Sequence, residues 1–529
     1  MAHKFKRLGL MLDMSRNAVM SIDALKAYMP IVRKMGYNCI MLYTEDTYEV
    51  EGEPYFGYMR GRYSMEELRE LDAYAESLGI ELIPCIQTLA HFTAYTRWRT
   101  VAYDNDDTLL VGDERTYEFI ERLIASVRSC FKTKYIHIGM DEAMNLGRGK
   151  YLDRNGYTEK TEIMREHLAR VNEIVKKYDF EPMMWSDMFF RSIFENKYYV
   201  GKTEMPAASK AALPEGVIPV YWDYYHEKRE EYDAMLYNHE QLSKNTWFAG
   251  GIWTWRGFLP CNTYSLNTMI PAIDECHAHK VDNVFFTMWG DNGGECSRYS
   301  VLPSLFYLAE YARGNKDAAA IKAKFEKRFG LSFEDFMLFE KLNVAYKNSK
   351  DHRADPKAVL FSDYFFNFRD VDHLEDYAAV AAETAKQLHA VAKKSRRFGY
   401  LFDSAAGLCD VFAVKYDLGV KTRAAYKAGD KTELARLANE EYTAAYRLIG
   451  RFAAAFEKQW MKENKAAGFE VQHIRLGGLL MRTAACRRRL LDFAKGNIDR
   501  IEELEGELLP LNQSNASSSY NNISSIGLL

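Results

Sequence analysis

The chain has 529 residues, which is too long for one ordinary core, so we expect two or three domains. Basic and acidic residues nearly balance, at 70 against 74, which argues against nucleic acid or a membrane surface as a partner. The eight cysteines are scattered without a C-x-x-C pair, and no signal peptide or membrane span is predicted, so we expect reduced thiols and a cytoplasmic protein.

The first 315 residues alternate short β-rich runs with helical patterns, which is typical of a parallel sheet wrapped by helices. Eight βα units predict a closed (β/α)8 TIM barrel over residues 1–315. An open doubly wound sheet is the alternative, but it usually has a glycine-rich phosphate turn after its first strand, where this chain has Asp13-Met-Ser-Arg16. The predicted strands are 8–13, 39–44, 81–87, 135–139, 181–185, 217–222, 247–252 and 284–289, and helical periodicity marks 22–35, 65–78, 117–127 and 161–177.

Beyond residue 315 the strand signal ends, and we predict an all-α helical domain over residues 316–510. Ala-rich segments at 378–395 and 432–457 and a Leu/Arg-rich segment at 474–495 place small and apolar residues at the spacing that helix packing needs. Dimerisation and extension of an active-site rim are the two roles considered for this domain. The Ser/Asn-rich end, 511–529, has no periodicity and is predicted to be a flexible tail.

Polar and aromatic residues gather at the predicted carboxyl ends of the strands, where the active sites of barrels lie. The fourth strand ends in Asp141-Glu142, and both acids can face one ligand only if the chain leaves the strand between them. A sugar ring has apolar C–H faces and a rim of hydroxyls, so aromatic walls with carboxylates and an arginine predict a carbohydrate pocket. Five of the eight tryptophans lie at these ends: Trp185, Trp222, Trp253, Trp255 and Trp289.

A metal site competes for such acids and histidines, but its support in the sequence is weak. No H-E-x-x-H occurs, and His277-Ala-His279 has the wrong spacing for two ligands on one helical face. His137 lies inside the fourth strand and is interpreted as a core or supporting residue. We therefore expect neither a metal nor a cofactor.

The block His137-Ile-Gly139-Met-Asp141-Glu142 has the form H-x-G-x-D-E, and with it the chain resembles glycoside hydrolase family 20, the β-N-acetylhexosaminidases. The resemblance covers about residues 7–300. It implies removal of terminal, non-reducing β-linked N-acetylglucosamine or N-acetylgalactosamine with retention of configuration, through a substrate-assisted oxazolinium mechanism. Further matches in the family's order are Arg16, Trp185, Tyr221 with Asp223, and Trp289 with Asp291.

The resemblance also implies roles for these residues. Glu142 would protonate the leaving oxygen and later activate water, Asp141 would hold the acetamido N–H, and Tyr221 would hydrogen-bond the acetamido oxygen. Arg16 would bind ring hydroxyls through its rigid fork of donors. The other expected substrate-binding residues are His91, Trp185, Asp223, Trp253, Trp255, Trp289 and Asp291, of which Trp253 and Trp255 would share a face if their strand continued through both.

The chain departs from the family pattern in three places. The Pro-Gly that usually precedes His91 is missing, the barrel begins near residue 8 without a preceding α+β domain, and Asp291 replaces the more usual glutamate. Two other functions stay open. One is a retaining glycosidase with Asp223 or Asp291 as nucleophile, and the other is a barrel that binds amino sugars without cleaving them.

Overall fold

The computed structural model describes residues 3–207, 210, 213–347, 349, 355–509, 520 and 524. The chain forms two compact units, and the boundary between them is crossed several times along the sequence. The first unit comprises Met1–Ile252, Ser265–Trp289 and Ser304–Asp317, and the second comprises Trp253–Tyr264, Gly290–Pro303 and Ala318–Leu529.

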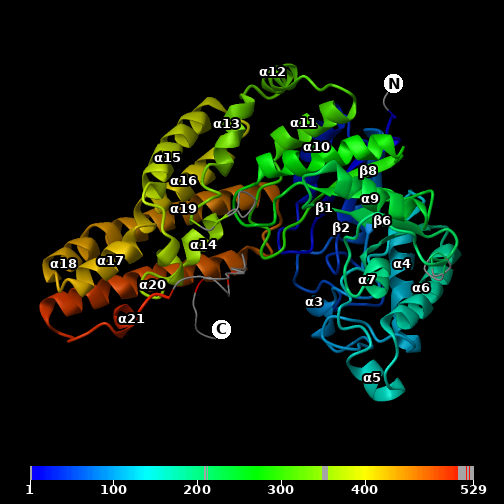
Figure 1. Cartoon of the computed structure of the whole chain (residues 1–529), viewed down its shortest axis with the longest axis horizontal. Coiled ribbons are helices and arrows are strands. Elements are labelled where there is room, and N and C mark those ends of the chain that lie inside the picture. Colours follow the sequence, from blue (N-terminus) through cyan, green and yellow to red (C-terminus); the bar gives the residue numbers. More distant parts are fainter. Residues whose placement is uncertain are drawn as a thin grey trace. The chain divides into compact units, whose positions relative to one another are not determined.

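The first unit contains eight parallel strands that close into a barrel in chain order (Figure 1). The first strand pairs with the last, from Arg7 opposite Asn283 to Leu12 opposite Met288, which closes the ring. The predicted barrel is confirmed, and every predicted strand is found with its ends within two residues. The strands are β1 Arg7–Asp13, β2 Cys39–Tyr43, β3 Glu81–Cys85, β4 Tyr135–His137, β5 Glu181–Trp185, β6 Ile218–Trp222, β7 Trp247–Gly251 and β8 Asn283–Met288.

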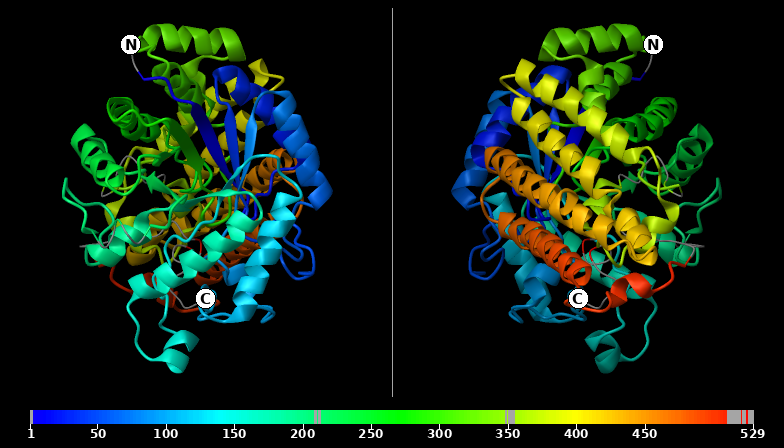
Figure 2. Two further views of the ribbon diagram at one scale, coloured as in Figure 1. Left: turned by 90° about the vertical axis from the view of Figure 1, so that its right-hand side faces the viewer. Right: turned by 90° about the vertical axis from the view of Figure 1, so that its left-hand side faces the viewer.

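Helices surround the barrel, and local signals fix where several of them begin and end (Figure 2). The first helix starts where the Ser21 side chain accepts the Ala24 N–H, and it ends at Gly36, which has a left-handed φ of 112°. A capping box of Ser64 and Glu67 starts the second. The helices are α1 Ile22–Met35, α2 Met65–Ser77, α3 Thr93–Thr96, α4 Glu114–Arg128, α5 Lys150–Asn155, α6 Lys160–Lys177, α7 Asp187–Ile193, α9 Arg229–Glu240, α10 Asn262–Ala278 and α11 Leu302–Ala312.

Side chains of each strand alternate between the helices and the barrel interior. On β8, Met288 contacts Tyr28 of α1, so even-numbered residues of this strand face outward. Phe285 instead lies 6.2 Å from Trp185 and 6.4 Å from Trp247, measured between ring centroids, so odd-numbered residues face the interior. Aromatic rings from β5, β7 and β8 therefore lie in the barrel interior.

The second unit is helical, as predicted. Its long helices α15, α16, α19 and α20 lie side by side in chain order (Figure 2, right). The segment expected at 432–457 forms two helices, because α18 ends at Asn439 and α19 begins at Glu441. The elements are α12 Ala318–Phe329, α13 Phe333–Met337, η1 Leu338–Glu340, α14 Pro356–Phe361, η2 Phe368–Asp372, α15 Tyr377–Lys394, α16 Gly399–Lys415, α17 Leu418–Lys427, α18 Lys431–Asn439, α19 Glu441–Glu463, α20 Phe469–Lys495 and α21 Glu502–Glu505.

Two segments that precede residue 315 belong to this second unit. Phe258 packs against Phe452 and Phe456, with ring centroids 5.4 and 5.3 Å apart. In the other segment, Glu295 pairs with Lys357 at 2.7 Å, and each side chain is 2% exposed. The two units are thus interleaved in sequence, whereas we expected a single cut between residues 315 and 316.

Two further expectations concern the tail and the membrane. The expected tail at 511–529 lies outside the described residues, apart from Tyr520 and Ser524. Within the described part of the chain, none of the helices combines the length and the apolar character that crossing a membrane requires.

Candidate active site

Asp141 and Glu142 follow β4 on a sharply turned segment. Gly139, Met140 and Glu142 have left-handed φ values of 71°, 68° and 51°. This conformation costs a residue with a side chain about 1 kcal/mol or more, so the surroundings must hold it. Because the backbone leaves the strand conformation at this turn, the side chains of Asp141 and Glu142 need not point to opposite faces. Both can therefore contact one ligand.

Gln87, which follows β3, holds this turn. Its Oε1 accepts the Met140 N–H at 3.2 Å, and its Nε2 donates to Asp141 Oδ1 at 2.8 Å and to the Tyr43 hydroxyl at 3.0 Å. A Cβ on Gly139 would lie 2.0 Å from Gln87 Oε1, so only glycine fits there. Our sequence analysis missed Gln87, although it stood at the predicted end of the third strand.

His91 belongs to the acid cluster. Its Nε2 lies 3.3 Å from Asp141 Oδ2, and its Nδ1 lies 3.8 Å from Glu45 Oε1. Burial alone would lower the pKa of His91, but the charges of Asp141 and Glu45 raise it to about 10. The imidazole is therefore protonated at neutral pH and acts as a counter-ion of these carboxylates.

The pKa values of the two neighbouring acids shift in opposite directions because their surroundings differ. Burial raises the pKa of Asp141, but the His91 charge and the hydrogen bonds from His91 and Gln87 outweigh burial and hold this pKa below its usual value. Glu142 reaches solvent, yet the protein packed around it and the Asp141 charge raise its pKa. A carboxyl group with a lowered pKa and a carboxyl group with a raised pKa thus lie side by side.

A third acid, Asp187 at the start of α7, touches the pair. Its Oδ2 accepts the Glu142 main-chain N–H and the Arg191 Nε–H, both at 3.3 Å. Its Oδ1 is buried and has no hydrogen-bond partner among the described residues. Burial and the charges of Asp141 and Glu142 raise the pKa of Asp187 to about 7. Asp187 was not among the site residues that the sequence predicted.

Arg16 lies at the edge of the same cluster. Its Nη1 donates to Glu45 Oε2 at 2.7 Å, and the Tyr43 hydroxyl donates to Glu45 Oε1 at 2.9 Å. Glu45 is buried, and burial raises its pKa while the charges of Arg16 and His91 lower it. Glu45 therefore connects Arg16 with His91, and through His91 with Asp141.

Aromatic rings line the interior beside the acids. Trp289 lies 4.8 Å from Tyr43 and 6.0 Å from Trp185, measured between ring centroids. His137 lies 4.4 Å from Trp185, and its Nδ1 accepts the Gly139 N–H at 3.1 Å. Burial lowers the pKa of His137 to about 3, so it is a neutral core histidine that supports the turn, as interpreted from the sequence.

Tyr221 points away from the barrel interior, contrary to the role expected for it. Val220 pairs with Trp185 and Trp247, whose rings face inward, so the next residue faces the helices. The Tyr221 ring packs on His239 of α9, at 4.8 Å between centroids. Its hydroxyl donates to Asp223 Oδ2 at 2.7 Å. The Tyr-x-Asp match therefore names a tyrosine whose ring faces the helices.

Asp223 is likewise held in contacts within the protein. It is fully buried, and besides Tyr221 it contacts His226 Nδ1 at 2.7 Å and accepts the Tyr225 N–H at 3.1 Å. These partners fix the loop after β6, and the contact of Asp223 with sugar hydroxyls stays a prediction. The residue on the inner side of this loop is Tyr224, whose hydroxyl is hydrogen-bonded by Trp289 and Thr287.

Trp253, Trp255 and Asp291 belong to the second compact unit. Because β7 ends at Gly251, both tryptophans lie beyond the strand. The alternation of side chains along a strand therefore does not determine which way their rings point. Their rings stack on each other at 4.3 Å with an interplanar angle of 28°, and both residues are buried. Their contact with a sugar, and that of Asp291, stays a prediction.

Two groups of described residues have the spacing to hold a metal ion: His91 with Asp141 and Glu142, and Asp233 with Glu275 and His279. Ligation by His91 would require a neutral imidazole, which its raised pKa opposes. In the second group, Arg229 pairs with Glu275 and Lys202 lies 3.3 Å from Asp233, so cations of the protein already face both carboxylates.

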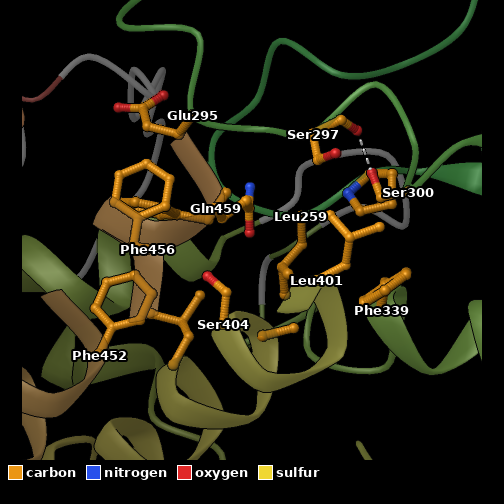
Figure 3. A pocket seen from close by; sticks show the side chains of 14 residues that line it. Leu259, Glu295, Ser297, Ser300, Phe339, Leu401, Ser404, Phe452, Phe456 and Gln459 are labelled. Atoms are coloured by element: carbon orange, nitrogen blue, oxygen red, sulfur yellow. Dashed lines mark hydrogen bonds between the residues drawn. The ribbon is translucent and has the colours of Figure 1, made fainter. Parts of the chain in front are cut away.

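The second unit has a cavity of its own, lined by Phe258, Ser297, Leu401, Phe452 and Gln459 among others (Figure 3). Its volume of about 20 Å³ is room for a single water molecule. The Ser300 hydroxyl donates to the Ser297 carbonyl oxygen at its edge. A cavity of this size cannot hold a sugar ring.

Two family models match the chain. The model "Glycosyl hydrolase family 20, catalytic domain" matches residues 5–231, and "Glycoside Hydrolase 20C C-terminal domain" matches residues 334–523. The chain is 23% identical to hexosaminidase D of Bos taurus over 340 residues, which is 59% of this chain and 94% of that protein. It is 32% identical to a beta-hexosaminidase of Vibrio furnissii over 133 residues, which is 21% of this chain and 22% of that one.

Among solved structures, the exo β-N-acetylglucosaminidase of family 20 from Vibrio harveyi, in complex with N-acetylglucosamine, matches with a TM-score of 0.48 and 16% identity. That match covers 63% of this chain and 58% of the other, so the chain spans less than two thirds of both Vibrio proteins. The first family model covers the barrel through β6, the second covers most of the helical region, and the H-x-G-x-D-E block lies within the first. The chain therefore belongs to glycoside hydrolase family 20.

Proposed function

We propose that the protein is an exo-β-N-acetylhexosaminidase that removes terminal, non-reducing β-linked N-acetylglucosamine or N-acetylgalactosamine with retention of configuration. The observation that carries the proposal is the acid pair after β4. Asp141 has a lowered pKa and Glu142 a raised one, although they are adjacent. Substrate-assisted hydrolysis needs one carboxylate that stays ionised and one carboxylic acid that gives up a proton.

In the first step, Glu142 gives its proton to the glycosidic oxygen as the bond from that oxygen to the anomeric carbon breaks. The acetamido oxygen of the same sugar attacks the anomeric carbon, which forms an oxazolinium ion and leaves Glu142 ionised. In the second step, Glu142 takes a proton from a water molecule that attacks the anomeric carbon and reopens the ring. The β configuration is restored, and Glu142 regains its proton.

Asp141 would stabilise the positive charge that develops on the acetamido nitrogen. A carboxylate serves this purpose only if it stays ionised at the working pH, which the protonated His91 at 3.3 Å and the Gln87 amide favour. The second Asp141 partner, Gln87, also fixes the turn, so the carboxylate is held in place before a substrate binds.

We assign the contact with the acetamido oxygen to Tyr224 in place of Tyr221. Tyr224 contacts Trp289, which lies beside Trp185 in the barrel interior, whereas Tyr221 packs on α9. Trp185 and Trp289 would form walls of the acetamido pocket, and Arg16, paired with Glu45, would bind ring hydroxyls.

The alternative with an enzyme nucleophile finds less support. Asp223, one of its two candidates, is fully buried and occupied by Tyr221 and His226, so it cannot reach an anomeric carbon without a rearrangement. A barrel that only binds amino sugars would have no use for an acid whose pKa is raised. Homodimerisation and a cytoplasmic location stay predictions.

The reaction is tested with aryl glycosides. The protein should hydrolyse an aryl β-N-acetylglucosaminide far faster than the matching β-glucoside, because only the first carries the participating acetamido group. Glu142→Gln should lose about 10²–10⁴-fold on substrates with poor leaving groups, since it removes the proton donor. Equal rates on the two glycosides, or an undiminished rate of Glu142→Gln, would contradict the proposal.

A matched pair of tyrosine variants tests the reassignment. Tyr224→Phe should lower kcat by about 10²-fold, because one hydrogen bond to the developing oxazolinium is lost. Tyr221→Phe should leave kcat within a few-fold and lower stability by about 1 kcal/mol, because its hydroxyl contacts only Asp223 in this structure. The reverse order of the two effects on kcat would restore Tyr221 to the site.

A further inference from the structure

Three aromatic rings form an exposed surface on the loops that follow β2 and β3. Tyr55, Tyr58 and Trp98 are 45%, 41% and 39% exposed. Tyr55 stacks on Trp98 with centroids 5.3 Å apart and an interplanar angle of 26°, and Tyr58 meets Trp98 edge to face at 5.6 Å. With Met59, which is 78% exposed, these residues are called the aromatic patch.

The patch rests on a rigid base. Phe56, next to Tyr55, is buried, and its ring lies 5.0 Å from that of Tyr95 in α3. Tyr95 stacks on Phe119 of α4, and its hydroxyl donates to Glu53, which ties the two loops together. The exposed rings are thus held in place before any ligand arrives, which lowers the entropy cost of binding.

The same two loops carry part of the acid cluster. The loop after β2 carries Glu45 and is anchored by an ion pair of 2.9 Å between Asp46 and Arg60, just beyond Met59. The loop after β3 carries Gln87 and His91 before it reaches Trp98. The patch therefore lies on the carboxyl-end loops of the barrel, the side on which the proposed substrate enters.

The chemistry of the patch fits a carbohydrate. Stacking covers one face of Tyr55 and of Trp98, and about two fifths of each residue stays open to solvent. Flat apolar faces suit the C–H faces of pyranose rings, and the tyrosine hydroxyls and the indole N–H supply hydrogen bonds at the ring edges. A cluster of exposed large apolar residues of this kind marks a binding surface.

We propose that the aromatic patch binds the sugar units on the leaving-group side of a glycan whose terminal N-acetylhexosamine occupies the active site. This inference rests on the proposed function, because an exo-acting enzyme holds only the last sugar among its catalytic residues. The remainder of the chain must pass over the carboxyl-end loops, where Tyr55 and Trp98 offer it a stacking surface. The patch would favour longer glycans over short ones.

The test compares substrates of different length. Trp98→Ala should lower kcat/KM about tenfold on a β-linked N-acetylglucosamine tetramer, the loss typical of one aromatic contact. The same variant should hydrolyse an aryl β-N-acetylglucosaminide within twofold of the parent rate. Tyr446→Ala, which removes an aromatic residue 47% exposed in the second unit, is the matched control and should change neither substrate. If Trp98→Ala unfolds, Tyr55→Ala carries the same expectations.

Binding titrations with the tetramer and with the single sugar distinguish this inference from the proposed function. Glu142→Gln should bind the tetramer more tightly than the single sugar, and adding Trp98→Ala should remove that difference. Equal tetramer hydrolysis by the parent and the patch variants, with intact aryl hydrolysis, would overturn the patch while the function stands. Failure of the parent on every β-N-acetylhexosaminide would instead remove the function. A change of oligomeric state in Trp98→Ala, without a change in tetramer affinity, would show that the patch joins two copies of the chain and overturn the inference.

Discussion

Asp141 and Glu142 are neighbours in the chain, but different side chains surround each carboxyl group. Asp141 has a protonated histidine and an amide donor as partners, whereas Glu142 has solvent on one side and the charge of Asp141 on the other. Pairs of acids whose surroundings separate their pKa values are the pattern expected for a stabilising carboxylate next to a proton donor. Asp187 adds a third charge that titrates near neutrality.

Asp187→Asn should shift the pH dependence of kcat/KM. Glu142 must be protonated to act as an acid, so activity falls as the pH rises through its pKa. Asp187 and Glu142 both carry negative charge when ionised, so removal of the Asp187 charge lowers the pKa of Glu142. The alkaline limb of the kcat/KM profile should therefore move to lower pH by up to about one unit. Asparagine keeps an oxygen that accepts the Glu142 N–H, so the turn is retained. The measurement is a pH profile on an aryl β-N-acetylglucosaminide.

Asp187→Ala provides the comparison, because it removes both the charge and the acceptor of the Glu142 N–H. It should shift the same limb and also lower kcat at every pH, since the turn loses one of its supports. A profile of Asp187→Asn that overlays the parent profile would show that Asp187 has no electrostatic influence on the acid.

At the scale of the elements, the strands and helices of the barrel could be predicted because their signals are local. Apolar runs of five or six residues, turn residues at their ends and helical periodicity between them specify βα units without any knowledge of the partners. The β4 end was overestimated by two residues, because Ile138 and Gly139 continue the apolar pattern while the backbone already turns at Gly139. That turn depends on Gln87, which is distant in sequence.

The direction of side chains on β6 could not be predicted in the same way. This strand reads Ile-Pro-Val-Tyr-Trp and is buried on both faces, so no alternation of polar and apolar residues marks its inner side. Its register with β5 and β7 settles the direction and places Val220, not Tyr221, toward the interior. Gln87, Glu45 and Asp187 were missed as members of the site for a related reason, since their importance comes from contacts between loops.

At the scale of the whole molecule, the two units share the chain in alternating segments. Residues 253–264 and 290–303 follow β7 and β8, which are strands of the barrel, yet these segments pack within the helical unit. Asn343 Nδ2 donates to the Pro260 carbonyl oxygen at 2.8 Å, and the Ser297 hydroxyl contacts both oxygens of Glu463 at 2.8 Å. The sequence boundary drawn where strands give way to helices therefore differs from the division of the chain into compact units.

A truncated chain that ends at residue 315 should therefore fail to fold stably. It would expose Phe258, whose burial contributes about 1.5–3 kcal/mol, and it would remove the side chains that surround Glu295 and Ser297. Such losses are a large fraction of the stability of a typical domain, about 5–15 kcal/mol. Thermal unfolding followed by circular dichroism should show no cooperative transition in the truncated chain, and aryl glycoside hydrolysis should be absent.

The full-length variant Lys357→Met, which removes the charge partner alone, should keep a cooperative transition at a lowered midpoint. A truncated chain that unfolds cooperatively and hydrolyses the substrate would show that the barrel is autonomous and that the packing of 253–264 and 290–303 on the helices is dispensable.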